Sequence, residues 1–273
     1  MMENAGILLC ATLAFYCAAA VLYLWTLGAG SDRAGPATAL AAAGLAAHTG
    51  VLIARGIEQG RAPLTNLHDS ISFAAWATMA IYLAARRVRR SAVFGGALSL
   101  VVLAAVVFGS TISGSTSEAL VPALRSRWST IHVVTSLLGY AGFALAFISA
   151  VGYVAQEKLL KAKRIDVFRN RLPSLDMLDR FAYSMVAVGF PMFTLGIVTG
   201  SLWAQNAWGS YWSWDPKETW SLITWLVYAA YLHVRMLLGR RGKLANRLLV
   251  AGFACVLMTF FGINLFAESL HAY

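Results

Sequence analysis

The sequence predicts an all-α, polytopic membrane protein with about eight transmembrane helices. Of its 273 residues, 59% are hydrophobic and only 12% are charged, well below the roughly 25% charged residues of an ordinary soluble domain. The apolar residues also form runs close to 20 residues long, the length that an α-helix needs to cross the hydrocarbon layer. The predicted spans are 5–27, 36–55, 69–85, 91–110, 130–155, 183–203, 217–238 and 246–267. The segments between them are short, so we expect residues 1–273 to form a single integral membrane domain.

The basic residues are distributed unequally between the two sets of loops. Seventeen of the 22 Lys and Arg residues lie in or beside the loops that join spans 1–2, 3–4, 5–6 and 7–8. Because cytoplasmic loops are enriched in Lys and Arg, we expect both termini to lie outside. The net charge of +10 is attributed to this bias. Nucleic-acid binding is not expected, since basic and aromatic residues are not interleaved on a soluble surface.

The first span and the cysteines carry further expectations. No Lys or Arg precedes Arg33, so the basic n-region of a signal peptide is missing and the first span is interpreted as a retained helix. Cys10, Cys17 and Cys255 lie within spans and are expected to be buried apolar residues. The absence of CxxC and CxxCH motifs argues against a thiol–disulfide reductant and against a c-type cytochrome.

The first half of the chain contains two informative outer loops. In residues 56–68, Pro63 and Asn66 predict a turn before a helix that begins at Asp69 or Ser70. His68 in this loop is interpreted either as a polar helix-end residue or as a ligand. Residues 111–119 are polar and are expected to form an outer loop.

The longest inner loop lies between spans 5 and 6. Apolar and basic residues alternate irregularly in residues 158–172, which suits a helix that lies on an anionic leaflet. Ser174 is expected to cap a separate short helix that reaches Phe181. In span 6, Pro191 predicts a kink, and Gly200 predicts close packing by another group.

Six of the nine tryptophans lie between residues 203 and 225, which we call the tryptophan segment. Flat, amphipathic rings at this density suit the face of a large planar ligand. The alternative is an aromatic belt at the membrane interface, which would place one or two aromatic residues at each helix end. The predicted ligand-binding residues, centred on an external loop at about 203–218, are Trp203, Trp208, Gly209, Tyr211, Trp212, Trp214, Asp215, Pro216, Lys217, Glu218, Trp220 and Trp225.

The end of this loop carries a helix-start signal. Asp215 is followed by Pro216 and, three positions later, by Glu218. This spacing predicts an N-cap, a proline at the first helical position and a capping-box glutamate. Helix 7 is therefore expected to begin at Pro216, and the two carboxylates are expected to hold the loop in place.

The histidines indicate which planar ligand is bound. His132, at the start of span 5, and His271, after span 8, are predicted on the same side as the tryptophan segment. Two neutral imidazoles on opposite faces of a porphyrin would complete six-coordinate haem iron. Each would need a hydrogen-bond acceptor at its other ring nitrogen. Lys217 is interpreted as a contact to a haem propionate or as a side chain that reaches the lipid interface.

His233 is predicted to belong to a different site. It lies 18 residues beyond Asp215, about 27 Å along a helix at 1.5 Å per residue, so it is expected towards the inner side. An ionisable residue within a span is a functional-site candidate. His48 does not match its depth, so the two are not expected to bind one haem. The ligand opposite His233 is expected from another subunit.

The segment Trp208 to Glu218 resembles the WWD motif of haem-handling proteins of cytochrome c biogenesis. The continuation to His233, and the end Ser-Leu-His271-Ala-Tyr, are similar to the CcsA (ResC-like) branch of System II. Pro63-Leu-Thr-Asn66 is also similar, and the resemblance covers most of the chain from about residue 55. The chain departs from the family at His68, where a tyrosine is usual.

The resemblance implies that haem b is carried to the outer face and attached to the CxxCH thiols of an apocytochrome c. It implies a cytochrome c haem lyase that works with a CcsB (ResB-like) subunit and with thiol-reducing proteins of the same pathway. His132 and His271 would be axial and catalytic ligands of an external haem, and His233 would ligate an intramembrane haem with a CcsB residue opposite. The membrane would be a bacterial inner membrane or a thylakoid-like membrane.

Two other functions remain open. One is a haem b electron-transfer subunit of a quinol oxidoreductase, although such proteins place histidine pairs at matched depths and need no tryptophan loop. The other is a passive haem transporter or chaperone, with attachment performed by another protein. The sequence does not separate the second alternative from a haem lyase.

Overall fold

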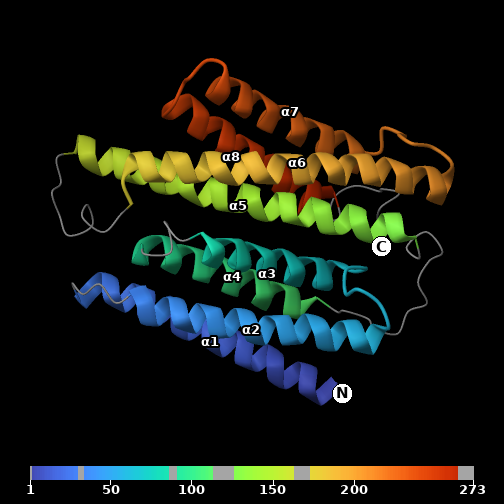
Figure 1. Cartoon of the computed structure of the whole chain (residues 1–273), viewed down its shortest axis with the longest axis horizontal. Coiled ribbons are helices and arrows are strands. Elements are labelled where there is room, and N and C mark those ends of the chain that lie inside the picture. Colours follow the sequence, from blue (N-terminus) through green and yellow to red (C-terminus); the bar gives the residue numbers. More distant parts are fainter. Residues whose placement is uncertain (1, 30–33, 86–90, 113–125, 163–172, 264–273) are drawn as a thin grey trace. The chain divides into compact units, whose positions relative to one another are not determined.

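The protein is an all-α membrane protein, as predicted. The computed structural model describes residues 2–29, 34–85, 91–112, 126–162 and 173–263, and these form helices and no strand (Figure 1). Six of the helices are long and apolar enough to cross a membrane. The helices are α1 (Met2–Ala29), α2 (Ala34–Gln59), α3 (Leu67–Ala84), α4 (Ala92–Thr111), α5 (Arg127–Lys161), α6 (Leu175–Trp208), α7 (Pro216–Met236) and α8 (Lys243–Leu257), with a π-helical turn η2 (Met258–Gly262) after α8.

Two helices, α3 and α7, are not among these six. Helix α3 is long enough at 18 residues, but His68 and Asp69 in its first turn lower its mean hydropathy. Helix α7 carries Glu218 in its first turn and His233 and Arg235 in its last, which lowers its mean hydropathy. Helix α2 is among the six although it contains His48.

Some predicted boundaries are wrong. Helix α3 begins at Leu67, because Asn66 is its N-cap and accepts a hydrogen bond from the Asp69 amide. Ser174 accepts from the Met177 amide as expected, but the helix that it caps is not separate. It runs on as α6 to Trp208, and Pro191, which has no N–H to donate, lies within the helix without ending it. Residues 163–172 of the predicted leaflet helix, and most of the loop 111–119, lie outside the described residues.

The chain divides into two compact units. The first comprises residues 1–118 and 155–178, and the second comprises residues 119–154 and 179–273. In the first unit, α1 packs against α2 and α4, and α3 packs against α4. These packings leave no room for side chains at Gly44 and Gly95, where a Cβ would lie 2.5 Å from the rings of Tyr16 and Tyr23, respectively. The single-domain organisation stays a prediction.

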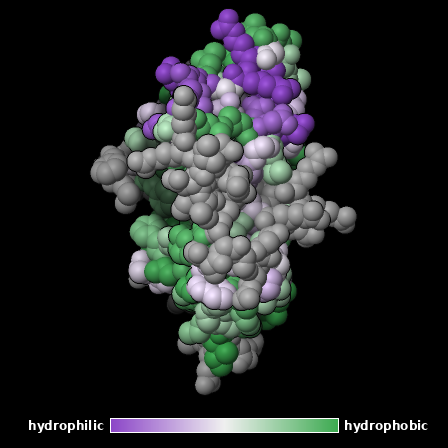
Figure 2. Space-filling view, turned by 90° about the vertical axis from the view of Figure 1, so that its left-hand side faces the viewer, coloured by the Kyte–Doolittle hydropathy of each residue, from purple (hydrophilic) through white to green (hydrophobic). Residues whose placement is uncertain are grey.

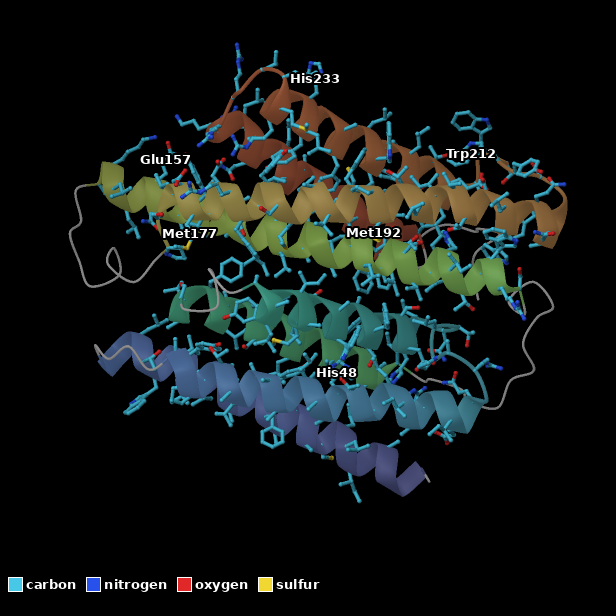
Figure 3. The ribbon with its side chains drawn as sticks, viewed as in Figure 1. His48, Glu157, Met177, Met192, Trp212 and His233 are labelled. Carbon is cyan, nitrogen blue, oxygen red and sulfur yellow. The ribbon has the colours of Figure 1, made fainter. Side chains whose placement is uncertain are left out.

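His48 lies among the helices of the first unit (Figure 3), where it is buried and both of its ring nitrogens have partners. Its Nε2 lies 2.9 Å from the Ser72 hydroxyl, and its Nδ1 lies 3.4 Å from the Tyr16 hydroxyl. The imidazole therefore connects α1, α2 and α3. An iron ligand needs an unengaged nitrogen lone pair, so this arrangement is structural.

In the second unit, α5 and α6 meet through glycines. A Cβ on Gly142 would lie 2.9 Å from the Met185 carbonyl oxygen and 3.1 Å from the Gly189 Cα. Close backbone approach through small residues is a usual way for helices to associate in membranes. The core of this unit continues beside the contact, where the Phe143 and Tyr228 rings stack with centroids 3.6 Å apart.

The prediction that all three cysteines are buried is wrong for two of them. Cys10 and Cys17 lie on an exposed face of α1, and Cys255 is half-buried in α8. Helix α1 is apolar on every side, as expected of a helix that faces lipid. Its sequence therefore does not show which of its faces packs against protein.

Arg235 differs from the other basic residues near the α7–α8 turn. Its guanidinium is buried, lies 2.5 Å from the buried Asp179 carboxylate and stands over the Tyr183 ring, so it holds α7 to α6. The other basic residues at this end are exposed, and hydrophilic side chains gather there (Figure 2). These are Arg240, Arg241, Lys243 and Arg247.

We expect Gly142→Ala to destabilise the second unit by about 1–3 kcal/mol, because the added methyl would meet backbone atoms that cannot rotate away. The measurement is the thermal unfolding midpoint of the full chain in detergent. Gly35→Ala is the control, since a Cβ there has no neighbour within 4 Å. Equal midpoints for the two variants would contradict the close α5–α6 contact.

Candidate functional site

The start of α7 is built as predicted. Helix α7 begins at Pro216, and Asp215 is its N-cap. The Asp215 carboxylate accepts hydrogen bonds from the Lys217 amide at 2.8 Å and from the Glu218 amide. The Glu218 carboxylate accepts one from the Asp215 amide at 3.3 Å. These reciprocal bonds form a capping box.

Glu218 also makes two bonds that the sequence did not predict. The same carboxylate oxygen accepts from the Ser213 amide at 2.7 Å and from the Ser213 hydroxyl at 3.1 Å. One buried carboxylate therefore bonds to both Ser213 and Asp215, the first and last residues of 213–215. Because a charged acceptor makes stronger hydrogen bonds than a neutral one, Glu218 is the main anchor of the loop 209–215.

The loop 209–215 turns sharply at both ends. Gly209 has φ +80°, and its amide closes the last turn of α6 onto the Gln205 carbonyl. Trp214 has φ +59°, an uncommon conformation for a residue with a side chain. Trp214 is 67% exposed, and Tyr211 is exposed as well. The turn therefore directs aromatic side chains outwards.

The tryptophans of the segment pair edge to face. The planes of Trp212 and Trp214 lie at 87°, with centroids 5.7 Å apart, and those of Trp203 and Trp208 lie at 71°. These pairs do not make one continuous flat surface, so a planar ligand would meet the rings at different angles. The Trp212 indole N–H is buried and has no hydrogen-bond partner within the described ranges. Its capacity to donate a hydrogen bond is therefore unused.

His132 has one ring nitrogen bound and one available. Its Nδ1 lies 2.7 Å from the Gly196 carbonyl oxygen in α6. A carbonyl can only accept, so Nδ1 carries the proton and Nε2 keeps its lone pair. Nε2 has no hydrogen-bond partner among the residues that the structure describes. This is the arrangement expected of a metal-ligating histidine, whose other nitrogen is held by a backbone or carboxylate acceptor.

Helix α6 shapes the surroundings of this ring. A Cβ on Gly200 would lie 2.6 Å from the His132 Nδ1, so only glycine leaves room for the imidazole. Trp203, one turn further on, is buried and stacks on the ring at 19° with centroids 5.9 Å apart. Trp203 in turn contacts Trp208. The Lys217 ammonium is also close enough to interact electrostatically with His132.

The structure thus brings some predicted residues together and separates others. His132, Trp203, Trp208 and Lys217 are linked as described above. Trp225 instead donates its N–H to Thr194 and packs against Phe190 in α6. Trp220 is half-buried in α7, and His271 lies outside the described residues.

Gly196 and Ser213 are the residues of this site that sequence reasoning missed. Gly196 supplies the acceptor for His132, and Ser213 is the loop residue that Glu218 holds. A signal for the first was present in the spacing of Gly196 and Gly200, one helical turn apart and on one face of α6. No local signal marks Ser213 as a partner of Glu218.

His233 is exposed in the last turn of α7. Its side chain points away from α6 and α8 (Figure 3). The exposed Leu226 and Leu237 flank it along the helix. The inner face of α7 contacts α6 through Trp225 and Arg235, so His233 is left open to a group from outside the described chain.

Comparison with known proteins identifies the family. Residues 64–271 match a family described as cytochrome C assembly protein. The chain belongs to the cytochrome c assembly protein family. It is 34% identical to cytochrome c biogenesis protein CcsA of Crocosphaera subtropica, over 99% of this chain and 96% of that protein. It is 36% identical to CcsA of Microcystis aeruginosa over 82% of each, and 32% identical to CcsA of Gloeobacter violaceus over 100% and 95%.

These similarities confirm the CcsA-type resemblance. Family membership gives the chain a role in cytochrome c maturation. The matched range 64–271 includes the whole tryptophan segment. It also includes His68, His132, His233 and His271. The candidate haem ligands of this chain therefore lie in the region that the family shares.

We expect Glu218→Ala to loosen the loop 209–215, because the Ser213 and Asp215 amides lose their acceptor. Hydrogen exchange of these two amides, read by mass spectrometry, should accelerate by about ten-fold or more. Glu157→Ala is the matched control, since that carboxylate makes a surface ion pair with Lys161. If exchange at residues 213–215 is unchanged in Glu218→Ala, the anchoring role is wrong.

Proposed function

We propose that this protein presents haem b to apocytochrome c on the outer face of the membrane and takes part in its covalent attachment. The observation that carries the proposal is His132, whose Nδ1 is held by Gly196 while Nε2 is left available beside the tryptophan segment. An imidazole oriented in this way is suited to bind iron axially. His271 is proposed as the second axial ligand.

Residues of the tryptophan segment fit a porphyrin with anionic side chains. The Trp212 N–H needs an acceptor, and the Lys217 ammonium carries a positive charge near His132. Both suit haem propionates. The exposed rings of Tyr211 and Trp214 offer apolar surface to the macrocycle. Trp225, which packs within the helices, would act indirectly by supporting α6.

The attachment reaction adds each CxxCH thiol across one vinyl group of the haem. An S–C bond and a C–H bond form as the S–H bond and the vinyl π bond break, so the step consumes no oxidant. The protein's contribution is to hold the vinyl groups where the thiols can reach them, which can remove a large part of the barrier. The axial histidines would also set the iron's reduction potential. Thiol-reducing proteins would keep the cysteines available.

A CcsB-like subunit is proposed as the partner. The exposed position of His233 supports this proposal, because a single protein ligand leaves one axial position of haem iron to be filled. A second haem within the membrane would then be shared between the subunits. The positive-inside bias supports an outer site for the tryptophan segment, in a bacterial inner membrane or a thylakoid-like membrane.

The electron-transfer alternative has little support, since both ring nitrogens of His48 are engaged. Passive haem transport is the second candidate, because the His132 site would serve binding without attachment. To separate the two, the chain is expressed with and without a CcsB-like subunit in a host that lacks its own maturation system. Thioether-bound haem on a reporter cytochrome c only when both are present supports attachment. If no thioether-bound haem forms with or without the CcsB-like subunit, passive transport is the function that is supported.

We expect His132→Ala to abolish thioether-bound haem on the reporter while the chain still inserts into the membrane. The reason is that iron loses an axial ligand and the vinyl groups lose their orientation. Thr135→Ala, one turn further along α5, is the control, since its hydroxyl bonds only within its own helix. Added imidazole should restore part of the activity. Failure of imidazole to restore any would make axial ligation by His132 doubtful.

We expect His233→Ala to lower the amount of haem that copurifies with the complex, measured by the Soret band and by pyridine haemochrome. Leu226→Ala is the control, because Leu226 is exposed two turns earlier on the same side of α7. Unchanged haem content in His233→Ala would remove the intramembrane site from the proposal.

A further inference from the structure

His68 is held in the same way as His132. It lies in the first turn of α3, and its Nδ1 is 2.8 Å from the Gly109 carbonyl oxygen of α4. The carbonyl again requires a proton on Nδ1, so the lone pair is on Nε2. Within the described ranges, Nε2 of His68 has no hydrogen-bond partner. His48, in the same unit, differs in having both nitrogens engaged.

A purely structural role explains the Nδ1–H group of His68 but not its Nε2 atom. The Gly109 carbonyl lies in the last turn of α4, where backbone acceptors lack helical partners. The His68 N–H satisfies it together with the Ile112 amide. A shorter donor such as asparagine could make the same bond. The capping role therefore gives no function to Nε2, which is the atom that distinguishes histidine here.

Asp69, the residue after His68, belongs to a buried polar cluster. The buried Asp69 carboxylate accepts from Arg55 at 2.6 Å and from Gln59 at 2.9 Å. The Arg55 guanidinium has a second buried nitrogen, Nη2, without a partner among the described residues. Because this nitrogen is buried, the guanidinium serves the ion pair that ties the start of α3, beside His68, to α2.

The ligand set limits the class of metal that could bind. The described part of the chain has no group of three or more His, Cys, Asp or Glu residues that could hold a metal ion. One imidazole is too few for a free ion, which needs about four ligands. A metal whose four equatorial positions are filled by a macrocycle needs only axial ligands. The chemistry therefore fits an iron porphyrin.

We propose that His68 is an axial ligand of a further haem-binding site in the first unit. This proposal rests on the proposed function in taking haem as the substrate. It adds a site to those of His132 and His233. Such a site would hold haem without attaching it.

The test uses the full chain with its CcsB-like partner, in a background with His132→Ala, His233→Ala and His271→Ala. His68→Asn is added to this background, because asparagine keeps the N–H donor to Gly109 and removes Nε2. The complex is titrated in detergent with ferric protoporphyrin IX and with metal-free protoporphyrin IX. We expect His68→Asn to raise the Kd of the iron porphyrin on the order of ten-fold and to leave that of the metal-free porphyrin unchanged.

Two outcomes would overturn the proposal. One is an unchanged Kd for the iron porphyrin in His68→Asn. The other is an equal rise in the Kd of the iron porphyrin and the metal-free porphyrin, which would show that His68 only supports the fold. If His68→Asn does not fold, His68→Gly with added imidazole replaces it, and binding that imidazole does not restore counts against ligation. The proposed function is tested by a different measurement, the thioether-bound haem formed by the His132→Ala single variant, so its failure can be told apart from failure of the His68 site.

Discussion

The backbone contact between α5 and α6 is the constraint on which the candidate site depends. In a bilayer each helix satisfies its own backbone, so helices associate mainly through close packing of small residues. Gly142 and Gly189 bring the two backbones together. Two turns further along α6, the same surface offers the Gly196 carbonyl to His132, and one turn beyond that it leaves space at Gly200. One helix contact therefore both packs the unit and selects the tautomer of the imidazole.

The tryptophan segment depends on this contact because it begins on α6. Trp203 is part of that helix and stacks on His132, so movement of α6 would displace the ring and the start of the segment together. At the other end, Glu218 fixes the loop to the first turn of α7 with three hydrogen bonds. The loop is thus anchored at both ends to helices that pack in the same unit. This suits it to hold a rigid ligand in one orientation.

The sequence predicted those features that depend on neighbouring residues. Long apolar runs indicated the helices, and the spacing of Asp215, Pro216 and Glu218 indicated the start of α7, because a capping box forms within a single turn. The bond between His132 and Gly196 joins positions 64 residues apart, so no local pattern contains it. No local pattern predicts the burial of Arg235 against Asp179 or the exposure of Cys10 either. Each depends on which face of a helix meets another helix.

The hydrogen bonds of the ring nitrogens separate the histidines in a way that their positions in the sequence cannot. All four described histidines lie within helices, where an ionisable side chain suggests function by default. His48 uses both nitrogens to join three helices, and its lone pair is occupied. His68 and His132 each use one nitrogen, on a glycine carbonyl of a neighbouring helix. His233 is exposed instead of being held by its own unit. A histidine held at Nδ1 is already oriented for iron, whereas His233 would be oriented only by a partner, and this difference follows from helix packing.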